Sequence, residues 1–446
     1  MLSLAGKSVL VLGLGVSGRS AANFCAARGA RVVAADERAA GAIEGLQTLE
    51  AGIERVVGRP FPDAAGFDLV VPSPGVAPAR YGAAARRVWG DVELAFRALP
   101  VPIVAVTGTN GKSTTTRLVE LMLRGAGLRA RAAGNLGEPA LSLVGEAIDV
   151  AVLEVSSFQL ETTEAFRPRV AVILNVTPDH LDRHGSFEAY RAAKALILAH
   201  QQTQDVAVLN FDDPSARSLA AQARGRVLPF RTAGALAHGA WLDAGAVVLR
   251  DEDGASRRIS LDGLQLAGVH NLENTLAALA AAWAAGAEPE RAARALAGFR
   301  GLPHRMEEVA RVAGVLYLND SKATNPSAAQ RSLASSDTSV VWIAGGRDKG
   351  LDFGALAEAA AGRVRAAVLL GETAGKLKDA LAGRVESHSV SCLEQAVLTA
   401  ARLARAGDVV LLAPACASQD QFRDFEERGE RFRAAVAALG RGARAS

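Results

Sequence analysis

The segment Thr107–Thr114, which reads TGTNGKST, constrains the fold more than any other feature of the 446-residue chain. It follows the apolar run Ile103–Val106 and leads into a stretch with Leu118 and Leu121 at helical spacing. A strand, a glycine-rich loop and a helix, in that order, direct backbone N–H groups toward a phosphate at the helix N-terminus. We therefore predict a phosphate loop made of Gly108, Thr109, Asn110, Gly111, Lys112, Ser113 and Thr114.

Two residue types in this loop have distinct expected roles. Lys112 would reach the β- and γ-phosphates, and the hydroxyl of Ser113 or Thr114 would bind Mg²⁺. The first glycine of the common P-loop pattern is replaced by Val106, so only Gly-x-x-Gly-Lys-Ser is present. A glycine turn with a solvated lysine is the alternative, but the strand and helix on either side favour ATP binding.

The rest of the chain alternates short Val/Ile/Leu runs with alanine-rich amphipathic stretches, which is typical of parallel α/β proteins. Strands are expected at Ser8–Leu12, Arg31–Ala34, Leu69–Val71, Ile103–Thr107, Val150–Glu154, Val170–Asn175, Val206–Asn210, Val315–Asn319, Val340–Ala344, Ala366–Leu370 and Val409–Ala413. Prolines at 100 and 102 and a glycine- and proline-containing stretch at 298–303 separate three series of elements. We predict three domains, with boundaries 1–98, 99–301 and 302–446.

Composition excludes several classes of protein. Hydrophobic residues make up 50% of the chain and charged residues 22%, as in a globular enzyme. A net charge of +3 gives no reason to expect a nucleic-acid partner. The three cysteines are far apart, which argues against a disulfide framework or a zinc site. The apolar run Val9–Leu12 is short and is followed by glycines, so we expect neither a signal peptide nor a membrane span, but a cytoplasmic protein.

A second glycine pattern lies near the N-terminus. Gly13–Gly18 forms a complete G-x-G-x-x-G after an apolar run, and Asp36 follows the next strand at the spacing of a ribose-binding acid. This pattern alone predicts either a dinucleotide oxidoreductase or a site for the pyrophosphate of UDP. An ordinary aspartate at a strand end is the alternative for Asp36.

Two more strands end in residues that can bind metal. Glu154 ends the strand Val150–Glu154, and the strand Val170–Asn175 is followed by His180. Because open parallel sheets bind ligands at the carboxyl ends of their strands, these groups can converge with the phosphate loop. We predict Glu154 and His180 as Mg²⁺ ligands. A core histidine is an equally good interpretation of His180 by itself.

The phosphate loop resembles the ATP loop of the Mur ligase superfamily, which includes folylpolyglutamate synthases. These enzymes phosphorylate a carboxylate and let an amine displace the phosphate, and the loop alone does not distinguish among them. Glu154–Glu161 (EVSSFQLE) and Pro414–Phe425 (PACASQDQFRDF) resemble the branch that adds D-glutamate. The resemblance extends over all three segments, and it implies an ATP-dependent ligase that joins D-glutamate to UDP-N-acetylmuramoyl-L-alanine.

The resemblance also implies a fold and a set of ligand contacts. The fold would be an N-terminal Rossmann-like UDP-binding domain, a central P-loop ATPase-like parallel sheet and a C-terminal Rossmann-like domain. The UDP-linked substrate would contact Leu14, Gly15, Val16, Ser17, Asp36, Arg38, Ser73, Gly75, Asn135 and His180. Beyond the phosphate loop, ATP would contact Asn274, Arg305 and Asp320. D-Glutamate would contact Lys322, Thr324, Lys349, Ser418 and Phe425, whereas Gln419 stands where an apolar residue is expected.

Lys194 depends most on the resemblance, which implies that it is carbamylated and helps to hold a second Mg²⁺. On spacing alone, a lysine on a helix surface is the better interpretation. Carbamylation needs a transiently neutral amine, which burial favours. The implied metal ligands are Ser113, Glu154, His180 and carbamylated Lys194, and the implied catalytic residues are Lys112, Glu154, His180, Lys194 and Arg305.

The alternatives at this point are another amide ligase of the superfamily, including a folylpolyglutamate synthase, and an NAD-dependent oxidoreductase. The N-terminal glycine pattern argues against a folylpolyglutamate synthase, which would need a pteridine-binding region. ATP dependence would exclude the oxidoreductase. We expect a monomer that binds two small substrates, ATP and Mg²⁺, without a nucleic-acid or membrane partner.

Overall fold

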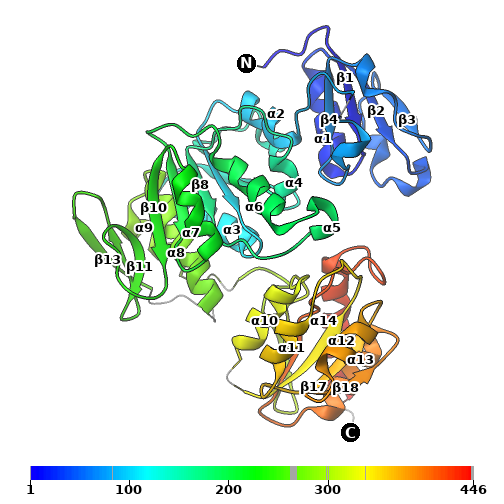
Figure 1. Cartoon of the computed structure of the whole chain (residues 1–446), viewed down its shortest axis with the longest axis vertical. Coiled ribbons are helices and arrows are strands. Elements are labelled where there is room, and N and C mark those ends of the chain that lie inside the picture. The colour runs from blue at the N-terminus through cyan, green and yellow to red at the C-terminus, as the bar shows by residue number, and fades with distance from the viewer. Residues whose placement is uncertain are drawn as a thin grey trace. The chain divides into compact units, whose positions relative to one another are not determined.

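The computed structural model describes residues 2–82, 84–261, 269–297, 299, 301–336 and 338–442 (Figure 1). Three β-sheets follow one another along the chain. The chain groups into two compact units. One unit comprises Met1–Val176, Ser186–Leu264 and Asn271–Gly298, and the other comprises Thr177–Gly185, Gln265–His270 and Phe299–Ser446. The first unit contains two of the sheets and the second unit contains the third.

The N-terminal sheet has four parallel strands in the order β3-β2-β1-β4. They are β1 (Ser8–Leu12), β2 (Arg31–Asp36), β3 (Glu54–Val57) and β4 (Leu69–Pro72). Helix α1 (Val16–Ala27) begins directly after the glycine turn that follows β1. Its buried face consists of small residues, among them Ala21, Ala22 and Cys25, so the helix can lie close to the strands.

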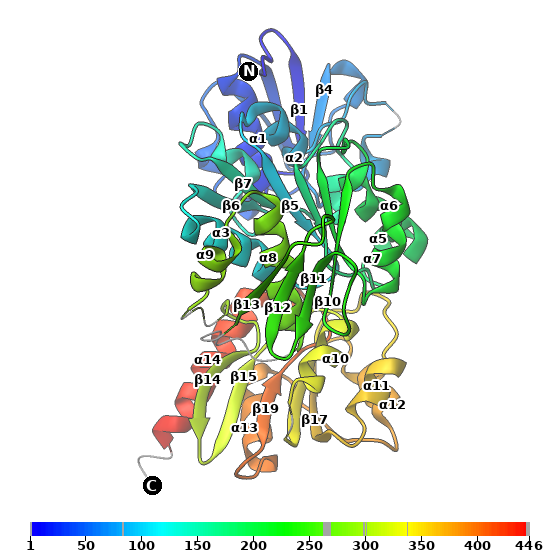
Figure 2. The ribbon, with the colours of Figure 1, turned by 90° about the vertical axis from the view of Figure 1, so that its left-hand side faces the viewer.

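The central sheet has nine strands in the order β13-β12-β11-β10-β9-β8-β5-β7-β6 (Figure 2). Its strands are β5 (Ile103–Thr107), β6 (Ala130–Gly134), β7 (Val150–Glu154), β8 (Val170–Ile173), β9 (Val206–Asn210), β10 (Arg226–Arg231), β11 (Gly239–Asp243), β12 (Ala246–Arg250) and β13 (Ser256–Ser260). The strands from β6 across to β11 are parallel, as expected, whereas β11, β12 and β13 pair antiparallel. For β11 and β12 the reason is local: Ala244 and Gly245 both have positive φ and form a two-residue hairpin turn, which can join only antiparallel strands.

Several helices accompany the central sheet. They are α2 (Asp91–Ala98), α3 (Lys112–Gly125), α4 (Ser157–Leu160), α6 (Phe187–Ala195), α7 (Pro214–Ser218), α8 (Val269–Ala284) and α9 (Pro289–Arg294). All residues of strands β5, β7, β8 and β9 are buried, which explains why these segments read as continuous apolar runs. The register pairs Val106 with Glu154 and Thr107 with Ile173, so β5, β7 and β8 end at the same edge.

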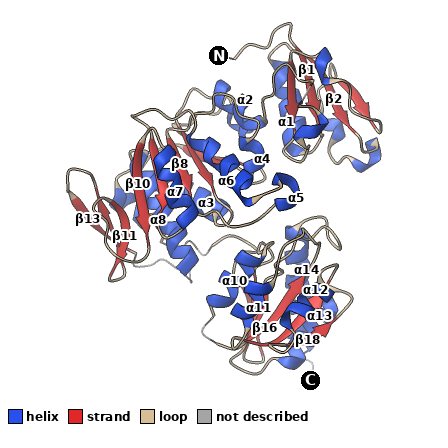
Figure 3. Ribbon diagram, viewed as in Figure 1, coloured by secondary structure: helices blue, strands red, loops and turns tan. Residues whose placement is uncertain are grey.

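The C-terminal sheet has six strands in the order β14-β15-β19-β16-β17-β18, of which only β14 is antiparallel to its neighbour. The strands are β14 (Glu307–Val312), β15 (Val315–Asn319), β16 (Val340–Gly345), β17 (Val364–Leu370), β18 (Glu386–Ser389) and β19 (Val409–Leu412). The helices of this unit are α5 (Leu181–His184), α10 (Pro326–Ala334), α11 (Gly354–Ala360), α12 (Ala374–Leu381), α13 (Leu393–Leu403) and α14 (Phe425–Gly442) (Figure 3).

Alternate residues of β16 face different cores. Trp342 packs in a cluster with residues of α10, α11 and α12, whereas Val341 and Ile343 pack with residues of α13 and α14. Helices therefore cover both faces of this sheet, and the expected α/β fold class is confirmed. Within the described residues, no helix has both the length and the apolar character needed to span a bilayer.

The third glycine of the N-terminal pattern gives a test of this packing. A Cβ at Gly18 would lie 1.8 Å from the carbonyl oxygen of Gly13, which is backbone and cannot rotate away. We expect Gly18→Ala to lower the free energy of unfolding by about 1–3 kcal/mol, the usual cost of overpacking. Gly41→Ala is the matched control because no atom lies within 4 Å of its added Cβ. Urea unfolding followed by fluorescence measures both, and equal stability of the two variants would contradict this packing.

Candidate functional site

The phosphate loop connects β5 to α3 and needs both of its glycines. Gly108 and Gly111 have φ values of +155° and +85°, which side-chain-bearing residues rarely adopt. A Cβ at Gly111 would also lie 2.3 Å from Oδ1 of Asn274. Gly111 is the N-cap of α3, so the loop leads directly into the helix N-terminus that was predicted to bind phosphate.

Asn175, which follows β8, braces this loop with three hydrogen bonds. Its carbonyl accepts from the Thr109 N–H at 2.9 Å, and its side chain both accepts from the Asn110 N–H at 2.9 Å and donates to the Asn110 carbonyl at 3.1 Å. Asn175 is not among the residues predicted from the sequence to bind a ligand. Its position at a strand end beside the loop was the available signal.

Two lysines converge on the carbonyl of Gly108. Nζ of Lys112 donates to it at 2.9 Å and also to the Thr109 carbonyl at 2.9 Å, and Nζ of Lys194 donates to it at 2.8 Å. Lys194 is 1% exposed and its Nζ lies 4.6 Å from the centroid of the Tyr190 ring. The interpretation of Lys194 as a surface lysine is therefore wrong, because α6 directs this side chain toward the phosphate loop.

Glu154 ends β7 one register position from the loop and is 1% exposed. Its Oε1 accepts from Nδ2 of Asn135 at 2.8 Å, whereas no described residue donates to the buried Oε2. A buried carboxylate oxygen without a donor is costly, and a cation is the group that suits it.

Glu154 and Ser113 are of residue types that bind Mg²⁺. Ser113 lies in the first turn of α3 and is buried. The described residues contain no cluster of three or more His, Cys, Asp or Glu side chains that could hold a metal ion. Mg²⁺ does not need such a cluster, since it binds through one or two protein groups and takes its other ligands from water and phosphate.

The N-terminal glycine turn is fixed by Asp36 and Ser73. Asp36 accepts from the Leu14 N–H at 2.7 Å and from the guanidinium of Arg38, and the Ser73 hydroxyl donates to the Gly13 carbonyl at 2.6 Å. Burial opposes ionisation of Asp36, but its hydrogen bonds from Arg38 and Leu14 outweigh that effect and hold its pKa below the usual value.

The predicted UDP residues of this turn differ in exposure. The Leu14 side chain is fully buried, whereas Val16 at the start of α1 is 55% exposed, which is unusual for a large apolar residue. Of these two apolar side chains, only that of Val16 is accessible to a ligand. Leu14 can contribute at most its backbone, and the contacts of the turn with UDP stay predictions.

The remaining predicted residues lie in the second unit and form two groups. In the first group, Asp179 accepts from the His180 N–H at 2.9 Å, from Nδ2 of Asn325 at 3.0 Å and from Nζ of Lys349 at 3.4 Å. His180 itself has a positive φ of 53° and caps α5. Asp179 therefore brings together two predicted ligand-binding residues, His180 and Lys349.

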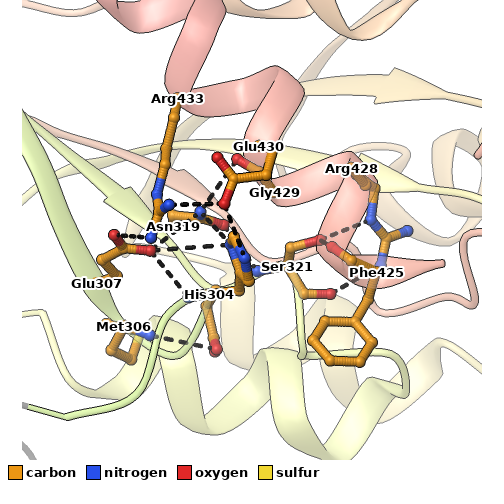
Figure 4. A network of polar contacts seen from close by, with 11 residues as sticks. His304, Met306, Glu307, Asn319, Ser321, Phe425, Arg428, Gly429, Glu430 and Arg433 are labelled. Atoms are coloured by element: carbon orange, nitrogen blue, oxygen red, sulfur yellow. Dashed lines mark hydrogen bonds and ion pairs between the residues drawn. The ribbon is translucent and has the colours of Figure 1, made fainter. Parts of the chain in front are cut away.

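The second group surrounds the start of α14 (Figure 4). Nζ of Lys322 lies 3.7 Å from the centroid of the Phe425 ring, and the His304 ring meets the same ring edge-on at 6.3 Å between centroids. Burial lowers the pKa of the His304 ring, and the backbone N–H of His304 donates to the Glu307 carboxylate at 2.8 Å. Ser418 is buried and lies on the loop after β19, shortly before Phe425 in the sequence.

Arg305 and Asp320 lie next to this group. Arg305 is flanked by His304 and Met306, which both have positive φ, and the Met306 N–H donates to Asp320 at 3.3 Å. Burial raises the pKa of Asp320, although the hydrogen bond from Ser332 acts in the opposite direction. The hydrogen bond from Met306 thus holds the backbone next to Arg305 close to Asp320. Arg305 and Asp320 are both predicted to contact ATP.

Together these features define an α/β protein with a phosphate loop at the carboxyl edge of a parallel sheet and a buried acid beside it, the arrangement of a nucleotide-dependent enzyme. Family models match three parts of the chain: the MurD-like N-terminal domain of Mur ligases at 7–87, the Mur ligase middle domain at 106–282 and the Mur ligase, glutamate ligase domain at 304–416. The chain belongs to the Mur ligase family.

Curated relatives match over the whole length. Proteins named UDP-N-acetylmuramoylalanine–D-glutamate ligase are 43% identical in Geotalea daltonii, over 99% of both chains, and 44% identical in Geobacter metallireducens, over 99% of this chain and 100% of the relative. The protein of that name from Pelotomaculum thermopropionicum is 45% identical over 98% of both chains.

Solved structures share the fold. A pseudomurein peptide ligase type C from Methanothermus fervidus is 18% identical with a TM-score of 0.63, covering 97% of this chain and 100% of that one. The MurF ligase from Thermotoga maritima in complex with ADP is 19% identical with a TM-score of 0.61, covering 97% of this chain and 96% of that one.

The brace at Asn175 gives a test of the nucleotide site. Asn175→Ala removes two hydrogen bonds to Asn110, so we expect the Kd for ATP to rise about tenfold, the effect of about 1–2 kcal/mol. Asn23→Ala is the control. The Asn23 side chain also donates to one carbonyl, that of Thr48, and accepts from one N–H, that of Glu50, in the N-terminal sheet region. Calorimetric titration with ATP measures both, and equal affinities would refute the role of the brace.

Proposed function

We propose that this chain is an ATP-dependent ligase that adds D-glutamate to UDP-N-acetylmuramoyl-L-alanine in peptidoglycan synthesis. One observation carries the proposal: full-length identity of 43–45% to proteins named for this reaction, in a chain whose phosphate loop and buried acid meet at one sheet edge. ATP would phosphorylate the alanyl carboxylate. The amine of D-glutamate would then attack the acyl phosphate, and the tetrahedral intermediate would collapse to the amide, releasing ADP and phosphate.

Charge repulsion is the first obstacle in this reaction. A carboxylate about 4 Å from one phosphate charge is repelled by roughly 4 kcal/mol at an effective dielectric constant of 20, and the triphosphate carries several charges. When bound, Mg²⁺ would neutralise part of the phosphate charge. Ser113 and Glu154 are the residues of the first unit that would hold this metal ion. Lys112 would exchange its two loop carbonyls for phosphate oxygens.

The groups of the second unit would act on the amino acid and on the departing phosphate. Lys322, Thr324 and Lys349 supply two cations and a hydroxyl, which suits the two carboxylates of D-glutamate. Ser418 and Phe425 would line the same pocket. Arg305 would stabilise the negative charge that develops on the phosphate as it leaves, with Asn274 and Asp320 holding ATP. His180 would contact the UDP-linked substrate and a metal ion.

Lys194 is proposed to act as a carbamate. The ammonium would first lose one proton, and the neutral amine would then combine with CO₂ and release a second proton, so that a cation becomes an anion with two oxygens. Its burial beside the Gly108 carbonyl and the Tyr190 ring supports this assignment, because the site is protected from bulk water and lies at the phosphate loop. The carbamate would be a further ligand for a second Mg²⁺.

The domain boundaries 1–98, 99–301 and 302–446 belong to the same proposal, with UDP bound by the first domain. Cytoplasmic location and a monomeric state also stay predictions. All three cysteines are free, and Cys25 and Cys416 are buried, which is compatible with a reducing compartment.

Substrate specificity is tested by ADP release. With ATP, Mg²⁺ and UDP-N-acetylmuramoyl-L-alanine, we expect D-glutamate to stimulate ADP release at least about a hundredfold more than L-alanine or meso-diaminopimelate, because the proposed contacts Lys322, Thr324 and Lys349 suit its two carboxylates. A coupled enzyme assay measures the release. Equal stimulation by another amino acid, or turnover only with a folate acceptor, would refute the assignment.

The carbamate is tested by chemical rescue. We expect Lys194→Ala to lose at least about 99% of its activity and to regain part of it with millimolar short-chain carboxylates, because they restore an anionic oxygen in the vacated space. After the carbamate is trapped as an ester, mass spectrometry should detect on the wild type an added mass of 44 Da plus that of the trapping group, and Lys194→Ala should lack it. Full activity of Lys194→Ala would contradict the proposal, and Lys376→Ala, at an exposed lysine, is the control.

A further inference from the structure

Arg428 on α14 is buried, with 2% of its surface exposed. Among the described residues, no carboxylate forms an ion pair with it. Its Nε donates to the Ser321 hydroxyl at 3.0 Å and one Nη donates to the Ser321 carbonyl at 2.8 Å (Figure 4). The other Nη donates to the carbonyls of Cys416 and Ala417 at 3.2 and 3.4 Å. Burial lowers the pKa of Arg428 to about 10, so the side chain is still charged at neutral pH.

A buried guanidinium without a carboxylate in direct contact is expensive, because its hydration is lost and the charge of Asp420 acts on it only from a distance. Fold stability alone would be served as well by an apolar side chain of similar volume. What an arginine offers is a rigid planar fork with five donors, which can fix several acceptors relative to one another. The acceptors of Arg428 show which segments of the chain the guanidinium holds together.

These acceptors belong to the segments that hold the proposed D-glutamate residues. Ser321 precedes Lys322, and its hydroxyl also donates to the carbonyl of Phe425 at 2.8 Å. Ala417 precedes Ser418, and its carbonyl also accepts from the Arg347 N–H at 2.9 Å, on the loop that leads to Lys349. One guanidinium thus connects the β15–α10 loop, the loop after β19, the loop after β16 and the start of α14.

We propose that Arg428 is a positioning residue that sets the spacing of the D-glutamate pocket. It does so by clamping Ser321 and Ala417, from which Lys322, Ser418, Phe425 and the loop of Lys349 extend. The inference rests on the proposed function, because it assumes that these residues bind D-glutamate. It adds a residue that contacts no substrate but determines how well the amino acid fits.

The proposed ATP-binding residues of this unit are held by other bonds. The Asp320 N–H donates to the Leu412 carbonyl at 2.8 Å, and its carboxylate accepts from Met306 and Ser332. None of these bonds involves Arg428. Loosening the clamp should therefore affect D-glutamate far more than ATP.

The experiment compares Arg428→Lys, Arg428→Met and the control Arg431→Met in the full-length chain. Arg431 is one turn from Arg428 on the same helix, but it is partly exposed and pairs with Glu394 on α13. Steady-state KM values for D-glutamate, ATP and UDP-N-acetylmuramoyl-L-alanine are measured by ADP release, and thermal unfolding verifies folding. We expect Arg428→Lys to raise the KM for D-glutamate about tenfold or more, with the other two KM values changed less than about twofold.

We expect Arg428→Met to exceed the effect of Arg428→Lys, since lysine keeps the charge and part of the donor set. If Arg428→Met does not fold, Ser321→Ala replaces it; this variant removes one acceptor of the clamp and should raise the same KM about threefold or more. Arg431→Met should behave as wild type.

The outcomes separate the inference from the function on which it rests. A wild-type chain that releases no ADP in response to D-glutamate overturns the proposed function. A wild-type chain that does so, together with a folded Arg428→Lys variant whose KM for D-glutamate is unchanged, overturns only the clamp. Equal increases in the KM values for ATP and D-glutamate overturn it as well, because they would indicate a general loss of structure.

Discussion

The pairing of β5 with β7 and β8 decides where the other groups of the nucleotide site can lie. Val106 is opposite Glu154 and Thr107 is opposite Ile173, so the phosphate loop, the buried acid and Asn175 all emerge at one edge. Because a slip of one residue would turn each of these side chains to the other face, register and site are specified together. The continuous burial of the three strands stabilises this register through the hydrophobic effect.

The same edge contains groups that a purely structural core would avoid. Lys194 and Glu154 are each 1% exposed, and Oε2 of Glu154 has no donor among the described residues. Arg428 shows the same pattern in the second unit, with carbonyls and a hydroxyl in place of a carboxylate. Buried charges of this kind lower the stability of the fold, so they are not explained by packing alone. Positions at which a sequence departs from the usual rules of burial are expected to be functional.

Much of the fold could be predicted from the sequence because its buried strands are short, apolar and bounded by glycine or polar residues. The segments Ser8–Leu12, Ile103–Thr107, Val150–Glu154, Val206–Asn210 and Val315–Asn319 match the observed strands. Strands β3, β13 and β18 were missed because they lie at sheet edges and have exposed polar residues. Strand β6 reads ARAAG, which resembles the alanine-rich helices, and only its neighbour β7 makes it a strand.

Some residues of the candidate site could likewise be predicted from the sequence, and others could not. Local patterns predicted the phosphate loop and Glu154, since each lies beside the strand that positions it. The burial of Lys194 could not be inferred from its sequence, because a lysine on an amphipathic helix is usually solvated and only the packing of α6 decides otherwise. Asn175 contacts Asn110, which is 65 residues away in the chain, and Arg428 contacts Ser321, which is 107 residues away, and no local pattern records such contacts.

On the proposed function, the chain activates the alanyl carboxylate by phosphoryl transfer from ATP at the edge of the central sheet. The most direct measurement uses UDP-N-acetylmuramoyl-L-alanine with ¹⁸O in that carboxylate, ATP and D-glutamate, followed by mass analysis of the phosphate released. We expect one ¹⁸O atom in each inorganic phosphate, because the acyl oxygen leaves with it. Unlabelled phosphate, or label found in AMP, would rule out an acyl phosphate formed by transfer of the γ-phosphoryl group.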